Sequence, residues 1–230
     1  MDADVERLVR EERLVAAAEL ARERGDLRTA SALFERACDF RAAAQVALEA
    51  GDFARALPLA LEGKDADTAG RALPGLVRDA SQAERVAFHL ERRGDHLWCG
   101  RLLEGIGKRA AAARAYERAG EALLAAELLE SEGDVAGAAR VLEAQARREP
   151  RSAIFVALGG LLLRYGKTDA AVRALQKVPE GAPERRAALT LLVGALDRLG
   201  LAEARTLAEQ ELTSLGGPVA EAAEPAPAAS

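Results

Sequence analysis

Hydrophobic and polar positions along the chain follow helical rather than strand spacing. Few segments alternate between apolar and polar residues, and β-branched residues are sparse. Alanine, leucine, glutamate and arginine, which have high helix propensities, dominate up to about residue 215. The pattern therefore predicts an all-α protein.

Pairs of glycine and aspartate mark the points where one predicted helix ends and the next begins. The pairs are Gly25 with Asp26, Gly51 with Asp52, Gly94 with Asp95 and Gly133 with Asp134. A glycine just past a helix can adopt positive φ, and an aspartate beside it can accept hydrogen bonds from the first N–H groups of the next helix. Ser81 and Glu84 have the spacing of a capping box, which predicts another helix start.

The spacing of these turns indicates a repeat. Turn residues recur every 12 or 13 residues over 25–63 and every 13 over 94–133, and the interval then lengthens to 33 and 34 residues up to Gly200. A helix of about ten residues cannot bury its apolar side alone, so such units must stack on their neighbours. We expect about fourteen helices in a right-handed superhelical solenoid of stacked antiparallel helix pairs.

Small, large apolar, glycine and proline positions recur in a fixed order in the last third of the chain. One segment carries Leu158, Gly159, Leu162, Gly166, Ala171, Leu175 and Pro183, and the preceding one Ala125, Ala126, Leu129, Gly133, Ala138, Leu142 and Pro150. A third carries Leu192, Leu196 and Gly200, with its second helix shifted by one residue to Ala204 and Ala208. This order resembles the tetratricopeptide repeat (TPR) family, most clearly over about 118–215, and the shorter repeats over 12–118 resemble it more loosely.

Composition shifts divide the chain into four parts. We expect short-helix repeats over 1–63, an irregular joint over 64–80 where Pro74 and Gly75 interrupt the helical pattern, and short-helix repeats passing into three TPR-like repeats over 81–215. Residues 216–230 are rich in alanine and proline and predict a disordered tail or linker.

The resemblance implies a concave groove, lined by the first helix of each repeat, that binds a peptide or partner protein. Its lining positions fall on Leu123, Glu127, Glu130, Val156, Gly160, Leu163, Arg164, Thr190, Gly194, Asp197 and Arg198. The family's carboxylate-gripping members use Lys and Asn at places that here hold Leu123, Glu127 and Ala157, which disfavours recognition of a C-terminal carboxylate. A groove that is merely a solvated helix face is the alternative reading.

Charge and composition narrow the partners and the compartment. The 230 residues carry a formal net charge of −5, the reverse of the basic surface of a nucleic-acid binder. No signal peptide and no apolar stretch long enough to cross a membrane is present, and two distant cysteines make no disulfide framework. We therefore expect a cytoplasmic protein without membrane insertion. Asparagine is absent and lysine and isoleucine are scarce, which indicates a GC-rich, bacterial genome.

Few residues invite a catalytic or metal-binding interpretation. Gly166, Lys167 and Thr168 end like a phosphate-binding P-loop, but Leu161 stands where its first glycine is required, so an inter-helix turn is favoured. His89, His96 and Cys99 have metal-ligand chemistry but too few partners, and a packed Cys99 with partly exposed histidines is favoured. We expect no cofactor, no metal and no catalytic residue.

These observations predict a non-enzymatic adaptor or scaffold in a bacterial regulatory or assembly system, with a protein or peptide partner. A secretion-type TPR chaperone that holds an exported subunit in the same groove is the alternative. A metal- or nucleotide-dependent enzyme is a less favoured third hypothesis, and self-association through a solenoid end remains open.

Overall fold

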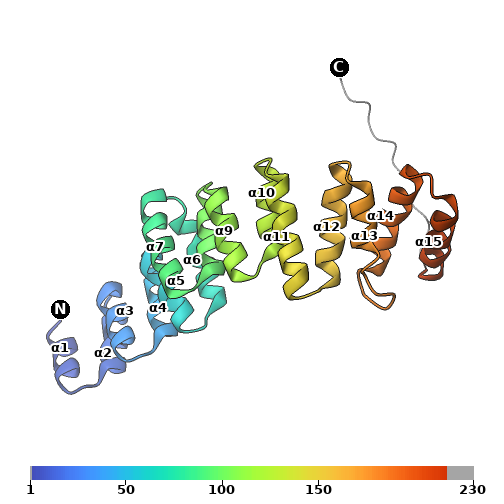
Figure 1. Ribbon diagram of the computed structural model, residues 1–230. Helices are drawn as coiled ribbons and strands as arrows, with labels where there is room; N and C mark the ends of the chain where they lie inside the picture. The colour runs from blue at the N-terminus through green and yellow to red at the C-terminus, as the bar shows by residue number, and fades with distance from the viewer. Residues whose placement is uncertain (1, 217–230) are drawn as a thin grey trace. The chain divides into compact units, whose positions relative to one another are not determined.

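The computed structural model describes residues 2–216, which form fifteen helices and no strand (Figure 1). The first nine helices are α1 (Ala3–Arg10), α2 (Leu14–Glu23), α3 (Leu27–Arg36), α4 (Phe40–Glu49), α5 (Phe53–Glu62), α6 (Ala66–Leu76), α7 (Ala80–Arg93), α8 (His96–Gly105) and α9 (Arg109–Ala119). The remaining six are α10 (Ala122–Ser131), α11 (Val135–Arg148), α12 (Ser152–Arg164), α13 (Thr168–Leu175), α14 (Arg185–Arg198) and α15 (Ala202–Ser214). The all-α prediction is confirmed, with one helix more than the expected number.

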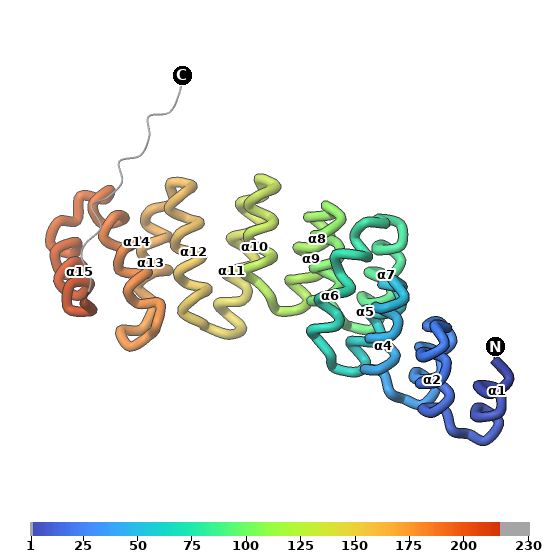
Figure 2. Tube along the Cα trace, turned by 180° about the vertical axis from the view of Figure 1, so that it is seen from behind, coloured from blue at the N-terminus to red at the C-terminus, as the bar shows by residue number. Residues whose placement is uncertain are grey.

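The chain divides into two compact units, unit 1 (Met1–Ala119) and unit 2 (Gly120–Ser230). Within each unit, consecutive helices pack against each other and run antiparallel, as Figures 1 and 2 show. Alternate helices also touch: α4 with α6 and α5 with α7 in unit 1, and α10 with α12 and α12 with α14 in unit 2. Each unit is thus a stack of antiparallel helix pairs of the TPR-like solenoid kind. The tail expected from residue 216 onward lies, beyond Gly216, outside the described residues.

The predicted glycine–aspartate pairs form the turns between helices. Their glycines have φ angles of 71° to 86°. The aspartates of three pairs each accept a hydrogen bond of 2.8 to 3.2 Å from the N–H three residues further on, namely Asp26, Asp52 and Asp134. Asp95 makes no such bond, and its carboxylate lies 3.0 Å from the Nε of Arg93 instead. Helix starts are therefore fixed locally by an aspartate in most of these turns.

The capping box predicted at Ser81 is wrong. Helix α7 begins at Ala80, and the carboxylate of Asp79 accepts a 3.0 Å hydrogen bond from the N–H of Gln82. Glu84, the expected second half of the box, lies 2.8 Å from the ammonium of Lys108 on the neighbouring turn. An aspartate two residues earlier already caps the helix, so the Ser81 hydroxyl is not needed for that role.

The irregular joint expected over 64–80 is wrong for most of that stretch, because helix α6 occupies it. Pro74 lies close to the end of α6, where its missing N–H removes only one helical hydrogen bond. Gly75 has a packing role: a Cβ added there would lie 2.4 Å from the ring of Phe53 on α5. The proline and glycine therefore permit close packing of a regular helix, and the compact units divide at 119 and 120 instead.

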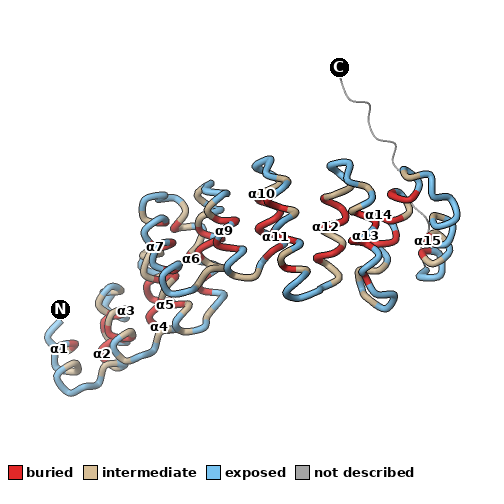
Figure 3. The backbone as a smooth tube through the Cα atoms, viewed as in Figure 1, coloured by how far each residue is buried: buried red, intermediate tan, exposed pale blue. Residues whose placement is uncertain are grey.

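The core of each unit is built mainly from small and aliphatic side chains. Figure 3 shows the buried residues in the middle of the helices, where neighbours touch, and exposed residues at the turns. Ala138 and Ala171, the small positions of two predicted repeats, are fully buried. A Cβ added to Gly159 of α12 would lie 2.6 Å from Leu175 of α13, which is itself fully buried. Small residues at the contacts therefore set the distance between paired helices.

Over residues 2–216, three residues other than glycine occupy the left-handed turn conformation. They are Glu12 with φ of 58°, Cys38 with φ of 58° and Lys64 with φ of 52°. Cys38 and Lys64 stand where the other repeats have glycine, and each precedes a capping aspartate. For a residue with a side chain this conformation costs about 1–2 kcal/mol. These turns are consequently strained relative to the glycine turns.

We predict that Lys64→Gly raises the free energy of unfolding by about 0.5–1 kcal/mol, because relief of the left-handed strain exceeds the extra chain entropy of glycine. Lys64 is exposed, so little packing is lost. Urea unfolding of the full chain measures the change. Lys64→Ala is the control and should bring no such gain, since alanine keeps the strain. A glycine variant less stable than the alanine variant would contradict the prediction.

Candidate partner-binding groove

A groove of about 560 Å³ opens in unit 2 along helices α10, α12 and α14. It is lined by Leu123, Ala126, Glu127, Glu130, Leu142, Val156, Ala157, Gly160, Leu161, Arg164 and Leu191. Its lining is largely aliphatic, with charged side chains from α10 and α12. Concave sites of this size and character commonly receive peptide side chains or small ligands.

The spacing of small residues along two helices creates the groove. Ala126 on α10 and Ala157 with Gly160 on α12 are three or four residues from larger lining residues, so they share a helix face with them. Their short side chains leave space that a leucine would fill. Leu123 stands at one end of α10 with 41% of its surface exposed, where an apolar partner can contact it.

Six of the eleven residues predicted to line the groove do so, namely Leu123, Glu127, Glu130, Val156, Gly160 and Arg164. All of the predicted residues of α10 line the groove, and Leu163 is the one predicted residue of α12 that does not. These residues of α10 and α12 therefore lie together along the groove, and binding of a partner there stays a prediction.

The five other predicted residues, Leu163, Thr190, Gly194, Asp197 and Arg198, do not line the groove. Thr190 donates its hydroxyl hydrogen to the carbonyl of Arg186 within α14, at 3.0 Å. Asp197 lies 2.6 Å from the guanidinium of Arg205 on α15. Leu163 and Arg198 contact each other, because Nη1 of Arg198 donates a hydrogen bond to the carbonyl of Leu163 at 3.5 Å.

Helix α14 presents a different side to the groove than the repeat pattern predicted. Its buried residues are Ala188, Leu189, Leu192, Ala195 and Leu196. With that set packed in the core, Leu191 rather than Thr190 faces the groove. Successive residues on a helix are rotated by about 100°, so a shift of one position moves the predicted set off the groove.

An ion pair between neighbouring helices closes one edge of the groove. Nε and Nη2 of Arg164 donate hydrogen bonds to the two carboxylate oxygens of Glu130, at 2.8 and 2.7 Å. These hydrogen bonds lower the pKa of the Glu130 carboxyl below its usual value and raise the pKa of Arg164. The two charges thus satisfy each other rather than a partner.

Glu127 is the lining charge that remains available. Its side chain is exposed, and no hydrogen bond or ion pair is formed by it within the described part of the chain. With Glu130 and Arg164 mutually neutralised, the groove presents an aliphatic centre and one carboxylate. A partner that combines apolar side chains with a cation would complement it.

The nucleotide and metal candidates lie elsewhere. Gly166 has φ of 72° and ends α12, and Lys167 precedes the first residue of α13, so the inter-helix turn prediction is confirmed there. Cys99 is buried, and desolvation, with a smaller contribution from Glu91, raises the pKa of its thiol to about 11. Over residues 2–216, no three His, Cys, Asp or Glu side chains come together as a metal site would require.

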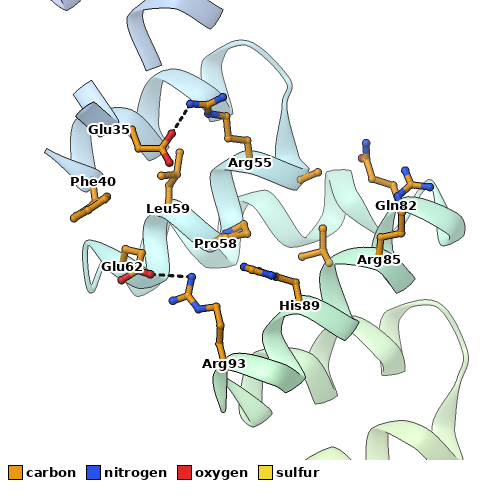
Figure 4. Close-up of a pocket in the computed structure, with 12 residues that line it drawn as sticks. Glu35, Phe40, Arg55, Pro58, Leu59, Glu62, Gln82, Arg85, His89 and Arg93 are labelled. Atoms are coloured by element: carbon orange, nitrogen blue, oxygen red, sulfur yellow. Dashed lines mark hydrogen bonds and ion pairs between the residues drawn. The ribbon is translucent and has the colours of Figure 1, made fainter. Parts of the chain in front are cut away.

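A second cavity, of about 610 Å³, lies in unit 1 between α5 and α7 (Figure 4). The sequence patterns did not indicate it. Two features of the sequence belong to its lining. Pro58 lies inside the helical stretch of α5, and Arg85 and His89 lie one helical turn apart on α7. Neither feature reveals a cavity without knowledge of how the two helices pack.

Comparison with known proteins assigns no family to this chain. No protein-family model matches the chain, and no curated protein matches it. Among solved structures, it is similar to one described as the functional characterization of Pseudomonas aeruginosa PilF, with 13% sequence identity and a TM-score of 0.38. The alignment covers 89% of this chain and 91% of that one. No helix among the described residues is both long enough and apolar enough to span a membrane.

We predict that Arg164→Gln lowers the free energy of unfolding at neutral pH by less than about 1 kcal/mol, since the Arg164 side chain is mostly exposed. The pKa of Glu130 is lowered in the folded state, so the pair stabilises the fold above the pKa of the unfolded carboxyl and stops doing so as Glu130 protonates. The difference from the unmodified chain should therefore shrink as the pH falls through the acidic range.

Urea unfolding at several pH values measures this difference. Arg198→Gln is the control, because Arg198 bonds a carbonyl and should give a difference that does not follow carboxylate protonation. A penalty for Arg164→Gln that stays constant or grows on acidification would contradict the assigned pair.

Proposed function

We propose that this protein is a non-enzymatic interaction module, an adaptor or scaffold of a bacterial regulatory or assembly system. Its partner is a peptide or a segment of another protein, bound in the groove along α10, α12 and α14. The observation that supports this proposal most is the aliphatic groove with a single available carboxylate, Glu127, at its side. Apolar contact gives such a site affinity, and the charge gives it orientation.

The partner segment is expected to present apolar side chains together with a basic residue. Apolar groups would cover Leu123, Val156 and Leu191, and the cation would meet Glu127. Helix faces that expose small and aliphatic residues receive amphipathic helices or extended segments in this manner. Because the groove is short and one charge sits at its rim, we expect modest affinity that falls with added salt.

The lining chemistry favours binding over catalysis. The groove contains no serine, cysteine, histidine or lysine that could act as a nucleophile or as a base near neutral pH. Its two carboxylates are poor candidates for an acid and base pair, because Arg164 holds Glu130 in the ionised form. A general acid needs the opposite shift of its pKa.

Self-association through the end of unit 2 is a second candidate. The terminal helix α15 leaves Leu207 66% exposed, and the flanking Leu201 and Leu215 are 49% and 44% exposed. Apolar side chains of this size on the last helix of a stack are suited to contact another molecule. A second, differently tagged copy recovered with the chain would support this candidate.

We predict that Leu123→Glu reduces recovery of the native partner at least about tenfold, because it places a charge on the apolar end of the groove. The matched control is Leu124→Glu, since Leu124 is the next residue, is 36% exposed and does not line the groove. The tagged full chain and both variants are used to purify partners from the native host, with quantification by mass spectrometry and circular dichroism to confirm folding.

The partner's identity then separates the two functional alternatives. Regulatory or assembly proteins would support an adaptor, and one small exported protein would support the secretion-type chaperone. Equal recovery of the same partner with Leu123→Glu and Leu124→Glu would contradict binding in this groove.

A further inference from the structure

The cavity of unit 1 combines an apolar floor with a polar rim. Residues of α3, α4, α5 and α7 surround it, and it shares no residue with the groove of unit 2. Its floor is formed by Phe40, Ala54, Pro58, Leu59 and Val86. A cavity of about 610 Å³ has room for several side chains of a peptide.

Two ion pairs hold opposite sides of the rim, as the dashed lines of Figure 4 show. Arg55 of α5 pairs with Glu35 of α3. Arg93 of α7 lies 3.0 Å from a carboxylate oxygen of Glu62 of α5, and its Nε is also 3.0 Å from Asp95. Both lining carboxylates, Glu35 and Glu62, are therefore already paired, and Glu62 shares Arg93 with Asp95.

The remaining polar side chains of the rim, Gln82, Arg85 and His89, come from one helix, α7. Arg85 and His89 lie four residues apart on α7 and so share a face. Both are exposed, and neither forms a hydrogen bond or ion pair within residues 2–216. In Figure 4 the His89 ring points toward Pro58 across the cavity. Among the described residues that line the cavity, Arg85 is consequently the one formal charge without a partner.

Pro58 adds an acceptor to these donors. It lies inside α5, and proline has no N–H to donate to the carbonyl four residues earlier. That carbonyl belongs to Ala54, which lines the same cavity. A backbone carbonyl without its helical partner is satisfied by water or by the N–H of a bound molecule.

We propose that this cavity binds an acidic peptide segment of a partner protein. A carboxylate of the segment contacts Arg85, a large apolar side chain covers Pro58 and Val86, and a backbone N–H of the segment donates to the Ala54 carbonyl. Charge complementarity selects the acidic side chain, since Arg85 is the lining charge that the ion pairs leave unpaired. The free carbonyl favours a peptide over a simple anion, because a simple anion has no N–H to offer.

The experiment is a nuclear magnetic resonance titration of the isotope-labelled full chain with acetyl-Glu-Leu-Phe-Glu-amide. We expect saturable shifts at Arg85, His89 and their neighbours, with a dissociation constant of about 0.1–1 mM for so short a probe. The matched probe with Gln in place of both Glu residues should bind at least about threefold more weakly. Sodium acetate and inorganic phosphate, tested separately, should give no saturable shifts there.

Two variants locate the site. Arg85→Gln should weaken binding of the acidic probe about threefold to fivefold, whereas Arg92→Gln should leave it unchanged. Arg92 is the control because it lies on the same helix, is exposed and does not line the cavity. Pro58→Ala, which restores an N–H to the Ala54 carbonyl, should also weaken binding while the thermal midpoint of unfolding does not fall.

Several results would overturn the proposal. They are no saturable shift with the acidic probe up to about 10 mM, equal binding of the Glu and Gln probes, or saturable binding of phosphate or acetate as strong as that of the peptide. Equal effects of Arg85→Gln and Arg92→Gln would do the same. None of these outcomes bears on the groove of unit 2, which Leu123→Glu tests separately.

Discussion

Close approach of paired helices through small side chains is the constraint on which the rest of this structure depends. The chain has only 3% aromatic residues, so its cores gain burial by packing many alanines and leucines at short distance rather than by filling wide gaps with rings. Ala138 and Ala171 are fully buried at such contacts. At Gly159 even a methyl group would collide with Leu175. Helix spacing is therefore set residue by residue.

The same small residues also shape the surfaces that we propose for binding. Where Ala126, Ala157 and Gly160 lie between larger residues of α10, α12 and α14, their small size leaves the groove of unit 2 open. Ion pairs between helices, such as Glu130 with Arg164, then brace the edges and remove charges that a partner would otherwise meet. What remains available at each site is a few apolar side chains and one unpaired charge, Glu127 in the groove of unit 2 and Arg85 in the cavity of unit 1. Such surfaces are suited to selective binding of short protein segments.

The features that depend on local chemistry could be predicted from the sequence. Predictions were less accurate for features that depend on how helices pack against each other. Turns at Gly–Asp pairs were predicted because φ preference and capping act within a few residues. The groove sides of α10 and α12 followed from the repeat frame, but in α14 a shift of one residue brought Leu191 rather than Thr190 to the groove. The helix over 66–76 was missed because Pro74 and Gly75 ordinarily interrupt helices, and here Gly75 accommodates Phe53. The cavity of unit 1 unites residues 35–93, and no local pattern specifies that arrangement.

The most direct test compares one chemical change at two helical glycines by urea unfolding of the full chain. Gly159→Ala should lower the free energy of unfolding by about 1–3 kcal/mol, because its methyl group meets the buried Leu175. Gly194→Ala should raise it by about 0.5–1 kcal/mol, because nothing lies within 4 Å of the added Cβ and alanine favours the helix. Opposite signs are the predicted result. If Gly159→Ala stabilises the chain as much as Gly194→Ala does, close packing through small residues does not set the helix spacing.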